Sequence, residues 1–146
     1  MFIKVLPVDQ ASKYWTIIAR TLAPAMLFED GKYTLDDVRD FVERGTAQVW
    51  IALDDGLIYG AAITQIADYP QKSMLLVLCL AGKDFKLWDN IVIDYFAPYA
   101  RSAKCQGIEF LGRKGWVKRA AKLGFKPVHI VYEMAVKDEN LDQRRS

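Results

Sequence analysis

The sequence predicts a single α/β domain in which helices and strands surround one mixed sheet. Apolar residues make up 52% of its 146 residues and charged residues 26%, as is ordinary for a globular domain of this size. Strand-like segments alternate with segments of helical periodicity, and Asp55-Gly56 is the strongest hairpin signal. We expect the order β-α-α-β-β-β-α-β-α-β over residues 1–136, followed by a polar tail at 137–146.

The first 28 residues are expected to form an edge strand and a helix. Residues 1–6 alternate weakly between apolar and polar side chains and predict the strand. Asp9 can cap a helix over residues 11–23, whose apolar residues fall on one broad face. Pro24 is expected to interrupt this helix because proline lacks a backbone donor, and residues 26–28 are expected to form a short turn.

A second helix and two strands of a meander follow. Thr34 can cap the helix, and Gly45 can end it in the left-handed conformation that glycine adopts readily. Residues 47–53 and 57–67, on either side of the hairpin turn, are apolar and rich in β-forming residues. Tyr69-Pro70 is expected to break the second strand.

The middle of the chain is expected to hold the most buried strand and a long helix. Residues 73–80, SMLLVLCL, are nearly all apolar and predict a central strand covered on both faces. A loop over residues 81–84 follows. From residue 85 to residue 99 the apolar side chains recur at helical spacing, and Pro98 is expected to kink this helix.

The C-terminal third predicts a short strand at 107–111, a basic helix within 112–125 and a last strand at 128–136. The turn Leu123-Gly124-Phe125 can end the basic helix, because its glycine can adopt the left-handed conformation while the flanking apolar residues anchor the turn.

Composition excludes several classes of protein. A net charge of +2 is too small to indicate nucleic acid or a membrane surface as the partner. No window of about 18 apolar residues predicts a membrane span, and the first residues lack the basic and apolar regions of a secretory signal. Cys79 and Cys105, with one histidine in the chain, do not make a metal site; we expect them to be buried side chains in a reducing cytoplasm.

The element order and the words KLGFKP and YEMAVK near the end resemble the Gcn5-related N-acetyltransferase (GNAT) superfamily. A narrower resemblance rests on TLDDVRDFVERGTAQVWIAL, GKDFKLWDNIV and ARSAKCQGIEFLGRKGWVKRAAKLGFK, which look like small GNAT-like proteins of tailed bacteriophages and prophages. The first resemblance implies a GNAT fold and acetyl-CoA chemistry. The second implies that fold in a group that includes virion components.

The GNAT resemblance implies an acetyl-CoA site at the junction after the fourth strand. The family loop usually reads Gln/Arg-x-x-Gly-x-Gly/Ala, because glycines let backbone amides approach the diphosphate at a helix N-terminus. The corresponding residues here are Leu80, Gly82, Lys83, Asp84 and Phe85. Only one glycine is present, and Asp84 suits a helix N-cap better than an anion site. We therefore expect a degenerate site, with no cofactor, or acetyl-CoA if the site is functional.

The catalytic acid and base are not identified by the sequence. The family tyrosine that protonates the departing CoA thiolate lies three to five positions before the Leu-Gly-Phe turn, where this chain has Arg119, Ala120 and Ala121. Other candidates are Tyr95 and Tyr132 for the acid, and Glu109 and Glu133 for the base. His129 is expected to be a strand residue rather than a catalytic base. The alternative for these acidic residues is an ordinary surface carboxylate.

Basic side chains gather around the last helix, where acidic residues are almost absent. We expect a contact surface for an acidic protein partner, formed by Arg113, Lys114, Trp116, Lys118 and Lys122. The alternatives are a solvated basic face, a site for the 3′-phosphate of CoA, and a core position for Trp116.

Two functions therefore stay open. In the first, the chain is a tailed-phage GNAT-fold protein with a degenerate site that acts as a virion-associated structural or partner-binding protein. In the second, it is an acetyl-CoA-dependent N-acyltransferase. We expect it in the cytoplasm or assembled into a phage particle, and we do not expect nucleic acid as its partner, since one tryptophan is no stacking platform.

Overall fold

The computed structural model describes residues 2–26, 31–82, 89–112 and 114–136. They belong to two compact units, Met1–Gly112 and Arg113–Ser146, and each unit is described by itself. The expectation of one domain over residues 1–136 stays a prediction. Among the described residues, no helix has both the length and the apolar character needed to cross a bilayer.

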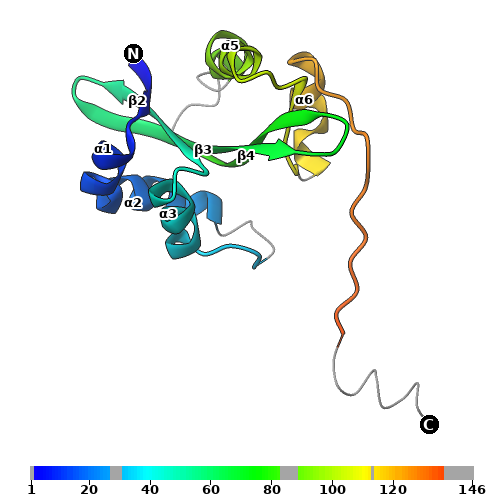
Figure 1. The fold of residues 1–146 in the computed structure, drawn as a ribbon, viewed down its shortest axis with the longest axis horizontal. Coiled ribbons are helices and arrows are strands. Elements are labelled where there is room, and N and C mark those ends of the chain that lie inside the picture. Colours follow the sequence, from blue (N-terminus) through cyan, green and yellow to red (C-terminus); the bar gives the residue numbers. More distant parts are fainter. Residues whose placement is uncertain (1, 27–30, 83–88, 113, 137–146) are drawn as a thin grey trace. The chain divides into compact units, whose positions relative to one another are not determined.

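The first unit is built on a five-stranded sheet in the order β1-β2-β3-β4-β5 (Figure 1). The strands are β1 (Phe2–Leu6), β2 (Gln48–Asp54), β3 (Leu57–Asp68), β4 (Ser73–Gly82) and β5 (Gly107–Glu109). The first four pair antiparallel, and β5 pairs parallel to β4. The predicted mixed sheet of an α/β protein is therefore confirmed.

The turn between β2 and β3 is the hairpin that the sequence predicts. Asp55 and Gly56 have φ angles of 49° and 76°. A two-residue turn of this kind needs positive φ at both positions, because its twist must match that of the flanking strands. Asp-Gly meets this need, since Asp tolerates the left-handed region and Gly adopts it freely.

Three helices cover one face of the sheet: α1 (Val8–Lys13), α2 (Trp15–Met26) and α3 (Leu35–Glu43) (Figure 1). Their buried residues meet those of the strands in one cluster. The largest contributors from the helices are Trp15, Ile18, Leu22, Val38 and Val42, which pack with Val49, Ile51 and Ile63 of the sheet.

The predicted helix over residues 11–23 is two helices, separated at Tyr14. Pro7, not Asp9, is the N-cap of α1, and Asp9 lies in its first turn. The expectation that Pro24 interrupts the helix is also wrong, because α2 continues through it to Met26. Leu22 is fully buried one turn from the helix end, and this packing outweighs one missing hydrogen bond. Residues 27 and 28 of the expected turn lie outside the described residues.

The predicted boundaries of α3 are confirmed. The Asp37 backbone N–H donates to Thr34 Oγ1 at 3.1 Å, and the Thr34 N–H donates to Asp37 Oδ2 at 2.9 Å, which completes a capping box. Gly45 has a φ of 76°, and the Thr46 N–H donates to the Phe41 carbonyl at 2.9 Å. This bond closes the helix in the manner expected of a left-handed glycine.

The opposite face of the sheet is covered by η1 (Val92–Phe96) and α5 (Ala97–Ser102) (Figure 1). The expected kink at Pro98 takes the form of a π-helical turn, in which the Ala97 N–H donates to the Val92 carbonyl. Pro98 then falls in the first turn of α5, where a missing N–H costs little. Residues 85–88 of the expected helix lie outside the described residues.

A buried polar chain joins β2 and β3 beneath this second helix layer. Trp50 Nε1 donates to Thr64 Oγ1, and that hydroxyl donates to Gln48 Oε1, each at 2.9 Å. Thr64 is fully buried, and the Trp50 ring makes edge contacts with Phe96 and Tyr99 at centroid distances of 5.1 and 5.3 Å. The threonine hydroxyl thus lets a tryptophan be buried with its N–H satisfied.

The second unit contains η2 (Lys114–Trp116) and α6 (Val117–Lys122). Gly124 has a φ of 96°, and the Phe125 N–H donates to the Ala120 carbonyl at 3.0 Å. The predicted glycine stop is therefore confirmed. The guanidinium of Arg119 lies 5.7 Å from the centroid of the Trp116 ring, a cation–π contact within the same short helical segment.

The predicted last strand, Val128–Val136, does not form. Residues 125–136 lie outside any helix or strand, although their apolar alternation is that of a strand. A strand exists only when a neighbouring segment accepts and donates its backbone hydrogen bonds. Among the described residues the sheet ends at β5, and no further strand joins it.

Replacing Thr64 by Val should lower the free energy of unfolding by about 1–3 kcal/mol, because the shape is kept while a buried indole N–H loses its acceptor. Urea unfolding monitored by tryptophan fluorescence measures this. Thr21→Val is the matched control, since the Thr21 hydroxyl bonds only its own helix at Ile17, and its cost should stay within about 0.5 kcal/mol. Equal costs for both variants would contradict the assignment.

The capping box should make α3 sensitive to acid. The hydrogen bonds from Thr34 lower the pKa of Asp37 below its ordinary value of 3.8. A lowered pKa stabilises the fold above the unfolded value, and this contribution is lost as the pH falls through the lowered pKa. Asp37→Asn keeps an acceptor but cannot titrate. The stability advantage of the native chain over this variant should shrink below pH 3.8 in urea unfolding; an advantage constant with pH would contradict the prediction.

Candidate functional site

The candidate site lies where β4 and β5 part. β4 pairs with β3 along its whole length, from Ser73 to Gly82. It pairs with β5 over only three positions, ending with Leu76 opposite Glu109. Beyond Leu76, no described strand lies along that edge of β4 (Figure 1). Alternate residues of an antiparallel strand direct their N–H and C=O groups to the same side, so this stretch presents backbone donors and acceptors along the open edge.

A β-bulge marks the start of the open edge. Ile63 lies opposite Cys79 while Thr64 lies opposite Val77, so that Leu78 is an extra residue of β4. The directions of the side chains agree with this bulge. The consecutive residues Leu78 and Cys79 both pack in the cluster that includes α2, whereas Val77 and Leu80 pack on the other face of the sheet. A bulge bends and twists its strand, and here it comes two positions after the last pair with β5.

Interactions behind the bulge hold the paired part of β4 and β5 together. The Gln106 N–H donates to the Ser73 carbonyl at 2.8 Å, and the Ser73 N–H donates to Gln106 Oε1 at 2.7 Å. Tyr69 donates its hydroxyl to Glu109, and this bond to a carboxylate, more than burial, raises the pKa of Tyr69. The two strands are therefore bound at one end and separate at the other.

Two of the predicted cofactor residues lie on the open edge. Leu80 and Gly82 belong to β4, which runs two residues further than the sequence predicted, and Gly82 is exposed. Leu80 packs in the cluster of Trp50. Lys83, Asp84 and Phe85 lie outside the described residues, so the expected phosphate loop and the expected N-cap stay predictions.

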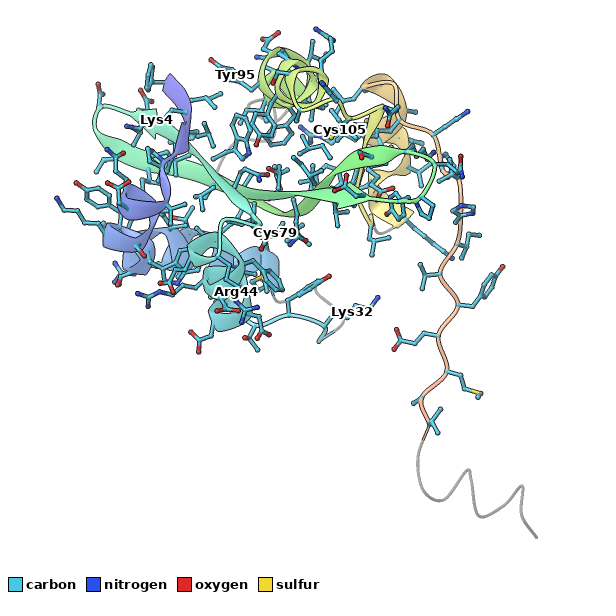
Figure 2. All side chains as sticks on the ribbon, viewed as in Figure 1. Lys4, Lys32, Arg44, Cys79, Tyr95 and Cys105 are labelled. Atoms are coloured by element: carbon cyan, nitrogen blue, oxygen red, sulfur yellow. The ribbon has the colours of Figure 1, made fainter. Side chains whose placement is uncertain are left out.

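Aromatic side chains form the floor on the side of α5. Trp50, Phe96 and Tyr99 meet edge to face beside Val77 and Leu80. Burial raises the pKa of Tyr99 and also that of Cys105, so both groups stay protonated at neutral pH. Figure 2 labels Cys79 on the face covered by α2 and α3, and Tyr95 and Cys105 on the side of α5.

The structure separates the candidate acids and bases. Glu109 is the last paired residue of β5 and accepts the Tyr69 hydroxyl, so it lies on a strand that flanks the divergence. Tyr95 lies in η1 and is 36% exposed. Tyr132, His129 and Glu133 belong to the irregular segment of the second unit. None of these positions assigns a catalytic role by itself.

The predicted partner-contact residues belong to the second unit, apart from Arg113, which is not described. Lys114, Lys118 and Lys122 are exposed, and Trp116 is half-buried. The exposure of these lysines is all that the structure adds, and the contact surface and its partner stay predictions. Among the described residues, no three His, Cys, Asp or Glu side chains come together as a metal site would require.

Sequence reasoning missed three features of the site: the bulge at Leu78, the Tyr69–Glu109 bond and the Trp50–Thr64 bond. The sequence marks Tyr69-Pro70 as the end of a strand and gives no sign of the Tyr69–Glu109 bond. A lone threonine among apolar strand residues, at Thr64, is the signal that a buried hydroxyl needs partners. The bulge has no signal in the sequence, since both Leu78 and Cys79 suit either face of a buried strand.

No protein-family model and no curated protein matches the sequence. The structure is similar to an aminoglycoside acetyltransferase from an uncultured soil metagenomic sample, solved in complex with sisomicin. That match has a TM-score of 0.69 and 12% identity, and covers 93% of this chain and 96% of the other.

Two further solved structures are similar over nearly their whole length. A predicted acetyltransferase from Clostridium acetobutylicum, solved with acetyl-CoA, has a TM-score of 0.66 and 14% identity, with 92% of this chain and 95% of the other covered. Glucosamine-6-phosphate N-acetyltransferase from Arabidopsis thaliana has a TM-score of 0.64 and 14% identity, with 94% and 100% covered. These relatives give no support to the phage resemblance. From its sheet order, its diverging strands and these likenesses, the chain has the GNAT acetyltransferase fold.

Proposed function

We propose that this protein is an acetyl-CoA-dependent N-acyltransferase. The observation that carries the proposal is the divergence of β4 from β5 after three pairs, with a bulge at Leu78 and an open edge that continues to Gly82. A structural relative with the same fold was solved with acetyl-CoA. Others are named as aminoglycoside and glucosamine-6-phosphate acetyltransferases.

The open edge fits the chemistry of the cofactor's long arm. The pantetheine arm of CoA carries amide groups, and an extended amide chain binds a free strand edge through backbone hydrogen bonds. Leu80 and Gly82 would hold this arm, with Lys83 supplying a positive charge for the phosphates. When bound, acetyl-CoA supplies an activated acyl thioester. The aromatic and aliphatic floor at Trp50, Val77 and Leu80 would keep water from that group.

The base that receives the proton of the incoming amine would be Glu109. It lies at the last pair between the diverging strands, and Tyr69 holds its side chain. An ionised carboxylate that accepts one hydrogen bond keeps further lone pairs for a second donor. The acid that protonates the thiolate is not assigned, because the position of the family tyrosine is occupied by Arg119, Ala120 and Ala121.

The second candidate is the partner-binding protein with a degenerate cofactor site. Its support is the junction sequence Gly82-Lys83-Asp84, which lacks the second glycine, and the exposed Lys114, Lys118 and Lys122 of the second unit. In this case the basic surface would bind an acidic protein, with Trp116 and Arg113 among its expected contact residues. A role in a phage particle rests on the sequence resemblance alone.

Calorimetric titration of the purified chain with acetyl-CoA and with CoA distinguishes the two candidates. An enzyme should bind both saturably, with a dissociation constant in the micromolar range. Gly82→Glu should weaken binding at least about tenfold, since it places a carboxylate beside the expected diphosphate, and about 1.4 kcal/mol of repulsion is enough for that factor. Gly82 is exposed, so the variant should fold.

Gln71→Glu is the matched control for this titration. It adds the same charge at an exposed turn at the other end of β4, and binding should stay unchanged. No binding at millimolar ligand would overturn the enzyme proposal and favour the partner-binding protein. Equal weakening by both variants would show that the diphosphate does not lie at Gly82.

A further inference from the structure

A side chain links the turn between β3 and β4 to the last paired residue of β5. Tyr69 directly follows β3, and its hydroxyl donates to Glu109 Oε1, 40 residues further along the chain. In the sheet, β4 lies between the two strands that this bond joins. Because Glu109 stands at the last pair before β4 and β5 diverge, the bond is made at the inner end of the open edge.

The backbone of Tyr69 is held on both sides. Its N–H donates to the Lys72 carbonyl at 2.8 Å, which closes the turn. The residue before it, Asp68, pairs with Ser73 and accepts a hydrogen bond from the Ser73 hydroxyl. The residue after it is Pro70, and a proline favours extended backbone at the position before it. The Tyr69 ring therefore leaves the turn from a fixed starting point.

The backbone of β5 is also held close to Glu109. Gly107 pairs with Met74, and a Cβ at Gly107 would lie 2.8 Å from Met74 Cε, so the Met74 side chain packs directly on the backbone of β5. Just before this strand, the Gln106 N–H donates to the Ser73 carbonyl at 2.8 Å, and Gln106 Oε1 accepts from the Ser73 N–H at 2.7 Å. Both ends of the Tyr69–Glu109 bond therefore start from backbone that other interactions hold.

We propose that Tyr69 is a positioning residue, which orients the carboxylate of Glu109 so that Oε2 receives the proton of the incoming amine. This inference rests on the proposed acyltransferase function and assigns the residue that orients its base. Tyr69 engages Oε1, so Oε2 is the oxygen left for the reaction. As the amine nitrogen bonds to the acetyl carbon, the carbon–sulfur bond breaks and its electron pair leaves with the thiolate. The proton that the nitrogen loses passes to Oε2 and then to water.

The chemistry of this hydrogen bond suits a positioning role. A phenol that donates to an ionised carboxylate makes a charge-assisted bond, which is stronger than a bond between neutral groups. The bond to Glu109 raises the pKa of Tyr69 above its ordinary value of 10.0, so the phenol keeps its proton and acts as a donor at neutral pH. A glutamate side chain loses rotational freedom when it is ordered. A base that is already held in one geometry therefore loses less entropy when the amine reacts.

Release of the CoA thiol from acetyl-CoA, measured with benzylamine, glucosamine, spermidine and a lysine-containing peptide, tests this role. Glu109→Gln should lower kcat about 100-fold. Tyr69→Phe keeps the ring and should lower kcat about tenfold, because the base is no longer oriented. The KM for the amine should change less than about twofold, since the hydroxyl does not bind the amine. In the Glu109→Gln background, Tyr69→Phe should have no further effect, because Tyr69 acts only through that carboxylate.

Tyr14→Phe is the matched control for the kinetics. It removes the hydroxyl of another surface tyrosine, which is 44% exposed against 48% for Tyr69. Tyr14 lies at the end of α1, so its hydroxyl is not part of the turn between β3 and β4. The kcat of this variant should equal that of the native chain.

The contact itself can be measured by NMR without turnover. In a chain with isotope-labelled tyrosine rings, the Tyr69 resonance is the one that Tyr69→Phe removes, and its titration gives the pKa of the phenol. Glu109→Gln should lower this pKa, because it removes the charged acceptor that raises it. A titration of Tyr69 that Glu109→Gln leaves unchanged would overturn the proposal.

The kinetic outcomes separate this inference from the proposed function. A kcat that Tyr69→Phe leaves unchanged, or lowers equally in the native and the Glu109→Gln backgrounds, would overturn the positioning role and leave the acyltransferase intact. A kcat that Glu109→Gln leaves unchanged would overturn the base and the positioning role together. No release of CoA with any of the four amines would overturn the proposed function, and this inference with it.

Discussion

The first unit depends on one constraint on β4. This strand pairs with β3 along its whole length, but it pairs with β5 over only three positions and then diverges from it. A regular strand cannot follow two neighbours that diverge. The extra residue at Leu78 resolves the conflict, because a bulge increases the local twist and turns the strand away from one neighbour without breaking the other ladder. The open edge from Val77 to Gly82 is the direct result.

The layers on the two faces of the sheet support that arrangement. On one face of the sheet, Leu78 and Cys79 pack in the cluster that contains Ile18 and Leu22 of α2, so both side chains at the bulge contact the same layer. On the other face, Thr64 lies opposite Val77 next to the bulge, and its hydroxyl binds the indole of Trp50. A buried hydroxyl that both accepts and donates a hydrogen bond is held in one orientation. These bonds therefore hold Thr64, and with it the register of β3 beside the bulge.

The chemistry proposed for the protein follows from backbone more than from side chains. Solved structures with 12–14% identity share this fold, which shows that very different side chains can build it. Backbone amides along an open edge bind an extended amide ligand whatever the side chains are. The junction after β4 has one glycine, and residues 119–121 contain no tyrosine; at these two points the sequence differs from the pattern that the GNAT resemblance implies.

Local patterns of residues are enough to predict the fold class and several of the turns and helix ends. The turn at Asp55-Gly56, the capping box at Thr34 and the glycine stops at Gly45 and Gly124 follow from backbone preferences that act within a few residues. Other features depend on contacts between segments that are far apart in the chain. Pro24 stays within a helix because Leu22 is buried against the sheet. Leu78 forms a bulge because β4 pairs with β3 throughout but diverges from β5. Residues 128–136 form no strand. These outcomes depend on which segments pack or pair with one another, and the local sequence of a strand does not specify its pairing partner.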